Sequence, residues 1–244
     1  MPTPQAQTIP LSVGTYALDA NTTASNNTAV GYASLGANTT GTENVAVGKG
    51  ALEANTTGSY NHAFGKNAGN AITTGATNIA IGNAALATAT TADGNTAVGH
   101  SALAANTSGA SNVAVGLNAL DVNTTASNNV AVGAEALGAN TTGSYNTAVG
   151  YGAIDSNTTG TYNVGLGYNV LTTNTTGAGN IAIGLNALYA NTTSADNVAV
   201  GVASMDANTT GTLNVAVGKN SLGANTTASN NTAVGTEALA ANTT

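Results

Sequence analysis

The sequence contains neither cysteine nor tryptophan, and it has one phenylalanine and three prolines in 244 residues. The absence of cysteine excludes disulfide bonds and thiolate metal sites. Charged residues make up 5% and aromatic residues 4% of the chain, whereas soluble domains carry roughly a quarter charged residues. A thick globular core is hard to build from so little bulk. Disorder is also disfavoured, because 42% of the residues are apolar and disordered chains combine low hydrophobicity with high net charge.

Positive charge is scarce as well. Three lysines and no arginine stand against ten acidic residues, for a net charge of −7. No basic patch is available to neutralise a phosphate backbone, so nucleic acid is not an expected partner. The chain has no apolar run of the roughly 20 residues needed to cross a bilayer, and its first residues lack the regions of a signal peptide. We therefore expect a soluble chain that does not insert into a membrane.

What the sequence does contain is a repeat. Asn44 to Tyr60 is one clean copy, and each of its positions names a column of equivalent residues. The columns of Lys49 and Glu53 vary freely and are expected to face solvent. The column of Gly48 never varies. Glycine recurs there every 17 residues through fourteen copies: Gly14, Gly31, Gly48, Gly65, Gly82, Gly99, Gly116, Gly133, Gly150, Gly167, Gly184, Gly201, Gly218 and Gly235.

A 17-residue unit is too short for a helical hairpin, which needs about 33 residues, and it suits one coil of a solenoid. The pattern predicts an all-β fold, a parallel β-solenoid or β-roll of fourteen coils, with strands at 44–48 and 51–55. All three prolines lie in a short N-terminal segment, residues 1–10, since proline would interrupt hydrogen bonds between coils. Residues 11–244 form the single repeat domain. At about 4.8 Å per coil, the rod would be on the order of 67 Å long.

The predicted core consists of two aliphatic columns. Alternation along the strand sends Val45 and Val47 to one face and Ala46 to the other. We expect the Val47 column to lie inside with the Leu52 column, where each buried side chain contributes about 1.5 to 3 kcal/mol. The predicted core ladder comprises Val30, Val47, Phe64, Ile81, Val98, Val115, Val132, Val149, Leu166, Ile183, Val200, Val217 and Val234, with Leu35, Leu52, Leu86, Leu103, Leu120 and Leu137.

The Ala46 column then points outward, yet it holds only small residues, with Ser12 and Gly165 as its two exceptions to alanine. An outward column restricted in this way implies close approach of another surface. We expect lateral packing against identical chains in a cyclic homo-oligomer. The predicted interface comprises Ala29, Ala46, Ala63, Ala80, Ala97, Ala114, Ala131, Ala148, Ala182, Ala199, Ala216 and Ala233.

Two asparagine columns are interpreted as stacked amide ladders at the bends. The second, the Asn55 column, is interrupted at Ile72 and Ala89, next to Gly69 in the leucine column, and we expect an irregular coil or a weak point there. The first is uninterrupted and comprises Asn27, Asn44, Asn61, Asn78, Asn95, Asn112, Asn129, Asn146, Asn163, Asn180, Asn197, Asn214 and Asn231.

These motifs resemble known families. Asn-Val-Ala-Val-Gly, with Asn-Ile-Ala-Ile-Gly at 78–82 and Asn-Thr-Ala-Val-Gly at 146–150, resembles the head repeat of trimeric autotransporter adhesins. The longer unit resembles more closely the repeat arrays of phage and bacterial tail-fibre-like proteins. The resemblance covers 11–244 and implies a left-handed β-roll that trimerises with the alanine-rich strand inward. The unit is three residues longer than that of the adhesin heads, and no stalk or anchor is seen, which disfavours an anchored autotransporter. With no capping segment at Thr244, we expect either a piece of a longer fibre or head-to-tail stacking into a filament.

Ice binding is the alternative from another class, because a threonine rank repeating about every 4.8 Å on a rigid rod can match a lattice. The competing interpretation is that these hydroxyls close the turn by bonding to backbone. The Asn-Thr-Thr and Asn-Thr-Ser sequences are also glycosylation motifs, in twelve of the fourteen copies, for which we favour a structural role. The candidate ice or surface rank comprises Thr22, Thr39, Thr56, Thr73, Thr90, Thr107 and Thr124.

No catalytic, cofactor or metal site is expected. A uniform array of Ala, Thr, Asn and Gly offers no convergent set of groups, the repeat lacks a calcium motif, and His62 and His100 are isolated in different columns. Consecutive-coil tyrosine pairs leave open a weak glycan platform. The sequence therefore predicts a non-enzymatic fibrous protein: the shaft or head of a phage or viral tail fibre or of an extracellular filament. Its expected partner is itself, as a trimer, with adhesin-like contact to a glycan or receptor.

Overall fold

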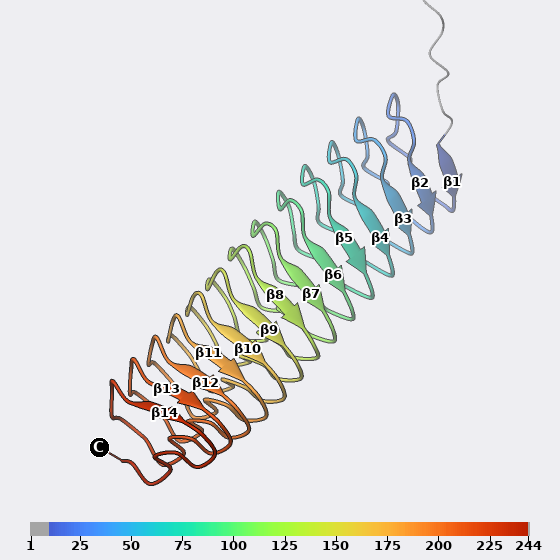
Figure 1. Cartoon of the computed structure of the whole chain (residues 1–244). Helices are drawn as coiled ribbons and strands as arrows, with labels where there is room; N and C mark the ends of the chain where they lie inside the picture. The colour runs from blue at the N-terminus through green and yellow to red at the C-terminus, as the bar shows by residue number, and fades with distance from the viewer. Residues whose placement is uncertain (1–9, 244) are drawn as a thin grey trace, which may run out of the picture.

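The computed structural model describes residues 10–243, and the predicted N-terminal segment therefore lies, except for Pro10, outside the described residues. The described chain is a rod of stacked coils with its two ends at opposite poles (Figure 1). Each coil contributes one three-residue strand to a single parallel sheet in the order β1 to β14. The strands are β1 Leu11–Val13, β2 Thr28–Val30, β3 Val45–Val47, β4 His62–Phe64, β5 Ile79–Ile81, β6 Thr96–Val98, β7 Val113–Val115, β8 Val130–Val132, β9 Thr147–Val149, β10 Val164–Leu166, β11 Ile181–Ile183, β12 Val198–Val200, β13 Val215–Val217 and β14 Thr232–Val234.

The predicted register of one coil per repeat is confirmed. Val47 pairs with Phe64 and Ala46 with Ala63, so each column lies directly over its equivalent in the next coil. The strands end at the invariant glycine for a steric reason. Gly48 has φ +134°, and a Cβ built there would lie 2.5 Å from the carbonyl oxygen of Gly65. Only glycine tolerates both that backbone conformation and that approach of the next coil.

The predicted second strand at 51–55 is wrong, because this side of the coil consists of turns. Gly50 and Leu52 both have positive φ, +66° and +50°, which an extended strand excludes. The coils are still joined here: the backbone amide of Leu52 donates to the carbonyl oxygen of Ala68 at 3.0 Å, and that of Ala54 to Asn70 at 3.0 Å. Hydrogen bonds therefore run along the rod on both sides, while strand geometry is confined to one.

The assignment of the two strand faces is also wrong. The Ala46 column is inside the coil, fully buried in its central copies, and the Val47 column is outside and partly exposed. The correction removes from the core Val30, Val47, Phe64, Ile81, Val98, Val115, Val132, Val149, Leu166, Ile183, Val200, Val217 and Val234. The predicted oligomer interface is wrong for the same reason, because its side chains are buried within the chain and cannot contact another molecule. These residues are Ala29, Ala46, Ala63, Ala80, Ala97, Ala114, Ala131, Ala148, Ala182, Ala199, Ala216 and Ala233.

The physical reason is the thinness of the coil. The strand and the turn side are so close that a methyl group fills the gap between Ala46 and the buried Leu52. The exception at Gly165 shows how tight this gap is: a Cβ there would lie 2.7 Å from Cγ1 of Ile154 and 3.2 Å from Cγ1 of Val170. Val170 stands where other coils have alanine or serine, so its extra methyl groups take the space that Gly165 vacates.

The leucine column lies inside, as expected. Leu35, Leu52, Leu86, Leu103, Leu120 and Leu137 are all fully buried. At Gly69, where leucine is missing, Ile72 is fully buried instead, and its Cδ1 lies 3.1 Å from where a Gly69 Cβ would be. The aliphatic group has moved three positions along the same coil. The expected irregularity is absent from the sheet, since β4 and β5 keep the common register, whereas a weak point in this stretch stays a prediction.

Both asparagine ladders are present, and they are buried. In the first, Asn44 Oδ1 accepts the backbone amide of Asn61 at 2.9 Å, and Asn44 Nδ2 donates across the coil to the carbonyl oxygen of Gly58 at 2.9 Å. In the second, Asn55 Nδ2 donates to Asn38 Oδ1 at 2.9 Å and to the same Gly58 oxygen at 3.0 Å. Two amides thus hold one inward-facing carbonyl in each regular coil. This explains why the first asparagine is constant from Asn27 to Asn231.

Candidate functional surface

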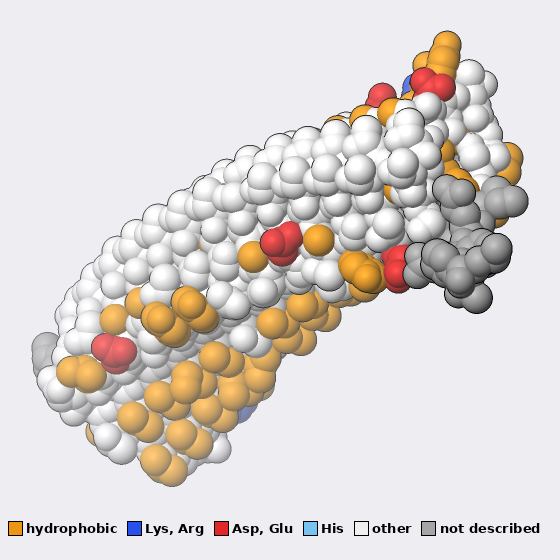
Figure 2. Space-filling model, turned by 90° about the horizontal axis from the view of Figure 1, so that it is seen from above, with side chains coloured by type: hydrophobic (Ala, Val, Ile, Leu, Met, Phe, Trp, Pro, Cys, Tyr) orange, Lys and Arg blue, Asp and Glu red, His pale blue; other side chains and the backbone are white. Residues whose placement is uncertain are grey.

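The outward side of the sheet carries a continuous column of apolar side chains, the Val47 column, beside a second column that is mostly apolar. We call the outward columns of Val45 and Val47 the strand face. Figure 2 shows hydrophobic side chains gathered in rows along the rod. Several members of the strand face are exposed by more than a third: Leu11, Val13, Phe64, Ile79, Ile81, Val149, Ile181 and Val234. The Val47 column contains only Val, Ile, Leu and Phe, and His62 is the one titratable side chain in either column.

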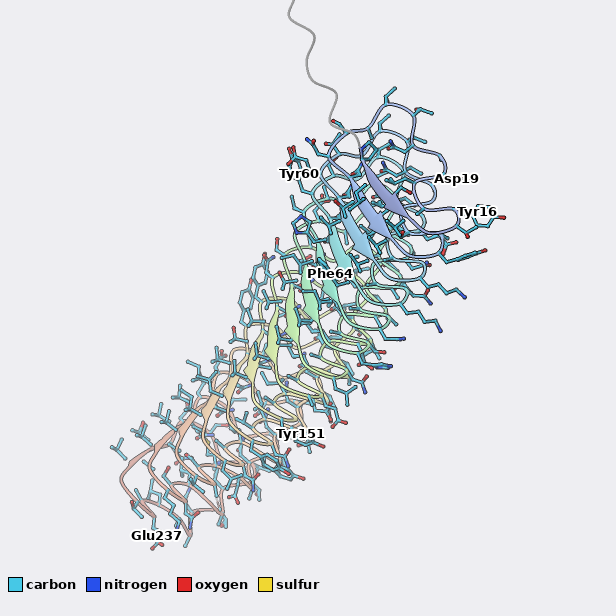
Figure 3. The ribbon with its side chains drawn as sticks, turned by 90° about the vertical axis from the view of Figure 1, so that its right-hand side faces the viewer. Tyr16, Asp19, Tyr60, Phe64, Tyr151 and Glu237 are labelled. Atoms are coloured by element: carbon cyan, nitrogen blue, oxygen red, sulfur yellow. The ribbon has the colours of Figure 1, made fainter. Side chains whose placement is uncertain are left out.

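Charge lies elsewhere on the surface. The predicted solvent-facing positions of Lys49 and Glu53 are exposed, and they belong to the turn edge that follows the strand. In Figure 3, Tyr16 and Asp19 lie on this edge, Tyr60 lies on the opposite edge, and Phe64 lies on the strands between them. The strand face is therefore a mostly apolar strip between two edges that carry the charged residues.

Tyrosines stack along both edges, as the spacing predicts. The rings of Tyr145 and Tyr162 are parallel within 5° with centroids 5.0 Å apart, and those of Tyr151 and Tyr168 are within 15° at 5.5 Å. Glu135 accepts a hydrogen bond from the Tyr151 hydroxyl, which raises the pKa of that tyrosine. Such pairs make flat, partly apolar platforms one coil long.

Acidic side chains gather on the turn edge in the middle of the rod. Burial raises the pKa of Asp155, and the negative charges of Glu135 and Asp121 raise it further. Burial also raises the pKa of Asp121 and of Asp206. These carboxyls are consequently easier to protonate than ordinary aspartates. Among residues 10–243, no group of three or more His, Cys, Asp or Glu side chains is placed to hold a metal ion.

The threonine rank is engaged in hydrogen bonds between coils. Thr56 Oγ1 donates to the carbonyl oxygen of Thr73 at 3.0 Å, and Thr124 Oγ1 donates to Thr141 at 3.2 Å. The same bond is made by Thr39, Thr73, Thr90 and Thr107. The hydroxyls of these six threonines therefore bond to backbone, as the competing interpretation expects, but each bond joins two neighbouring coils and does not close a turn within one coil. Their donors are not free to order water.

The glycosylation motifs begin with asparagines of the second ladder. Asn140 is fully buried, and its Nδ2 donates to Asn123 Oδ1 at 3.2 Å and to the carbonyl oxygen of Gly143 at 2.9 Å. A glycan needs that nitrogen exposed and unbonded. The structural role expected for these asparagines is confirmed within the folded rod.

The outward position of the strand face is the feature of this candidate surface that the sequence analysis missed. One signal could have found it: Gly165 and Val170 lie in the same copy, and relative to the alanine of their columns Gly165 has one methyl group fewer and Val170 has two more. Such compensation requires contact between the columns of Ala46 and Ala51, which places alanine inside.

No protein-family model, curated protein or solved structure matches this chain. No helix among the described residues is long and apolar enough to cross a bilayer.

Proposed function

We propose that the chain is a non-enzymatic structural rod that associates with identical chains through its strand face. The assembly is a homotrimer that serves as the shaft or head of a phage or viral tail fibre, or of an extracellular filament. The trimer and the left-handed winding come from the resemblance to adhesin heads and tail fibres. The rod would act by length and stiffness, and an adhesin-like contact with a cell surface would be made by its edges.

The observation that carries the proposal is the exposed Val47 column. Apolar side chains continue from Val13 to Val234 without a polar residue, and single exposed apolar residues are common on monomers whereas an unbroken strip is not. Members such as Phe64 and Ile81 expose 41% and 40% of their surface. Covering this strip with a second apolar surface removes it from water.

The size of the strip fits an interface between chains. Fourteen strands spaced about 4.8 Å apart and three residues wide give a footprint of about 60 by 10 Å, or about 600 Å² per chain. Stable interfaces bury about 800 Å² per partner, and a trimer divides the strand face of each chain between two neighbours, so the margins of the face must be buried as well.

The charge distribution supports the same surface. All ten acidic residues and all three lysines lie in columns other than those of Val45 and Val47. Two strand faces can therefore meet without burying a charge, which is the usual composition of an interface centre. The charged edges remain in water, where the net charge of −7 opposes association in other orientations.

Mass measurement in solution tests the proposal. The wild-type chain of 23.3 kDa should elute with a light-scattering mass of about three times that value. The double variant Val98→Asp with Val132→Asp should be monomeric at the same concentration, because pairing would bury its carboxylates. Both positions are solvent-accessible within one chain, so the circular dichroism spectrum should not change.

Thr91→Asp with Thr125→Asp is the matched control. It places the same two charges two coils apart on exposed positions outside the strand face. Its mass should equal that of the wild type. A monomeric wild type, or equal dissociation by both double variants, would contradict association through the strand face.

A further inference from the structure

A hollow lies on the turn edge at the N-terminal coils, away from the strand face. It has a volume of about 320 Å³ and is lined by Tyr16, Asp19, Tyr32, Gly36 and Glu53, among others. Figure 3 places Tyr16 and Asp19 together on this edge. The volume is at the lower end of the roughly 300 to 1,000 Å³ typical of small-molecule pockets.

The hollow arises from a missing side chain. Asp19, Gly36 and Glu53 occupy one column on three consecutive coils, so the glycine leaves a gap between two carboxylates. The atoms nearest to a Cβ built on Gly36 are backbone atoms, with the carbonyl oxygens of Ala33 and Tyr16 both at 3.3 Å. These carbonyl oxygens border the position closely on one side, and no side chain of a neighbouring coil is among its nearest atoms.

The equivalent glycine farther along the rod is different. A Cβ at Gly138 would lie 2.7 Å from Asp155 Oδ1, so the aspartate of the next coil occupies that gap. The third glycine of the column, Gly223, resembles Gly36, because the nearest atom to its Cβ position is a backbone carbonyl oxygen at 3.2 Å. The coils at Gly36 are distinguished by Tyr16 and Tyr32, which line the hollow beside the glycine.

Two tyrosines form the apolar wall of the hollow. The rings of Tyr16 and Tyr32 are 5.6 Å apart at an angle of 88°, and they are 57% and 51% exposed. Lys49 Nζ lies 5.7 Å from the centroid of the Tyr32 ring. The chain's own ammonium group therefore already takes the cation site of this ring. Glu53 accepts a hydrogen bond from Asn70 Nδ2 at 3.0 Å, which fixes its carboxylate at the rim.

We propose that this hollow binds a neutral pyranose unit of a glycan. The C–H face of the sugar ring packs on Tyr16, and its hydroxyl groups donate to the carboxylates of Asp19 and Glu53. The two carboxylates repel acidic sugars, and Lys49 competes with organic cations. The proposal does not rest on self-association, because the hollow belongs to a single chain and lies off the strand face.

Saturation-transfer NMR on the full chain tests the proposal. The probes are the methyl glycosides of glucose, galactose and mannose, with methyl glucuronide and tetramethylammonium as comparators. Irradiation of tyrosine protons should transfer saturation to ring protons of at least one neutral glycoside, with a millimolar dissociation constant. The comparators should receive none.

The decisive variant is Gly36→Asp, which fills the gap with the residue that its column carries in other coils, such as Asp19. It should weaken binding by at least about tenfold, which corresponds to about 1.4 kcal/mol, as should Tyr16→Ala. Gly223→Asp is the matched control, because it makes the same change in the same column in a remote coil. Its affinity should be unchanged. Absence of transfer to every neutral glycoside, transfer to tetramethylammonium alone, or full binding by Gly36→Asp would overturn the proposal.

Discussion

One coil departs from the regular repeat in two interior columns, and restoring the regular residues there is the sharpest test of how the interior is packed. Gly69 and Ile72 replace the Leu and Asn of the regular repeat. Ile72 is fully buried, and Asn55 Oδ1, which would accept a hydrogen bond from an asparagine side chain in place of Ile72, has no partner. Ile72→Asn, Gly69→Leu and the double variant together form a complete cycle.

Each single substitution should be costly. Ile72→Asn leaves a cavity beside Gly69, which lowers the free energy of unfolding by about 2 to 5 kcal/mol. A new hydrogen bond to Asn55 offsets about 1 kcal/mol of this loss. Gly69→Leu puts a Cβ 2.9 Å from Cδ2 of Leu52 and overpacks the coil by about 1 to 3 kcal/mol. The positive φ of +58° at Gly69 adds about 1 to 2 kcal/mol for a residue with a side chain.

The double variant restores the leucine and asparagine of the regular repeat, so its stability should be within about 1 kcal/mol of the wild type. The two substitutions then couple by at least about 2 kcal/mol. Adding Ala89→Asn should stabilise the double variant further, because the alanine offers no donor to the side-chain oxygen that Ile72→Asn introduces one coil earlier.

Urea unfolding followed by circular dichroism at one fixed protein concentration measures these free energies, and hydrogen exchange at residues 61–77 locates them. Fixed concentration matters because association adds to apparent stability. Additive single effects, with a coupling below about 0.5 kcal/mol, would show that the two side chains do not share one space.

Three further outcomes follow from the structure. Asn129→Ala removes the acceptor of the Asn146 amide and a donor to an inward carbonyl, and should destabilise the rod by about 2 to 4 kcal/mol in urea unfolding, whereas the exposed control Thr125→Ala should change it little. Burial raises the pKa of Asp121 and Asp155, so ionisation of these carboxyls lowers the stability of the fold at pH values above the raised pKa. This loss of stability disappears as the pH falls below the ordinary value of 3.8. The Asp155→Asn variant should accordingly melt at a higher temperature than the wild type at neutral pH, with the difference closing at acid pH; a difference independent of pH would contradict this. Because the threonine rank donates its hydroxyls to backbone, purified protein should show no thermal hysteresis in osmometry, and measurable hysteresis would revive the ice-binding alternative.

The fold could be predicted because repetition removes ambiguity. Each residue of Asn44 to Tyr60 is seen in many copies, and equivalent residues must meet once each copy closes one turn. The invariant glycine, the buried leucine and the two amide ladders all follow from this condition. The second strand was mispredicted because Leu52 and Gly50 adopt positive φ, a conformation that leucine rarely takes and that composition does not reveal.

The sequence by itself determined the period, the parallel register and the identity of the constant columns, since these depend only on which residues recur and at what spacing. Only the tertiary structure decided which strand face is inside. An alternating Val-Ala-Val strand has two faces whichever way it turns, and the distance to the opposite wall of the coil, wide enough for a methyl group and too narrow for valine, sends Ala46 inward and leaves Val47 on the surface.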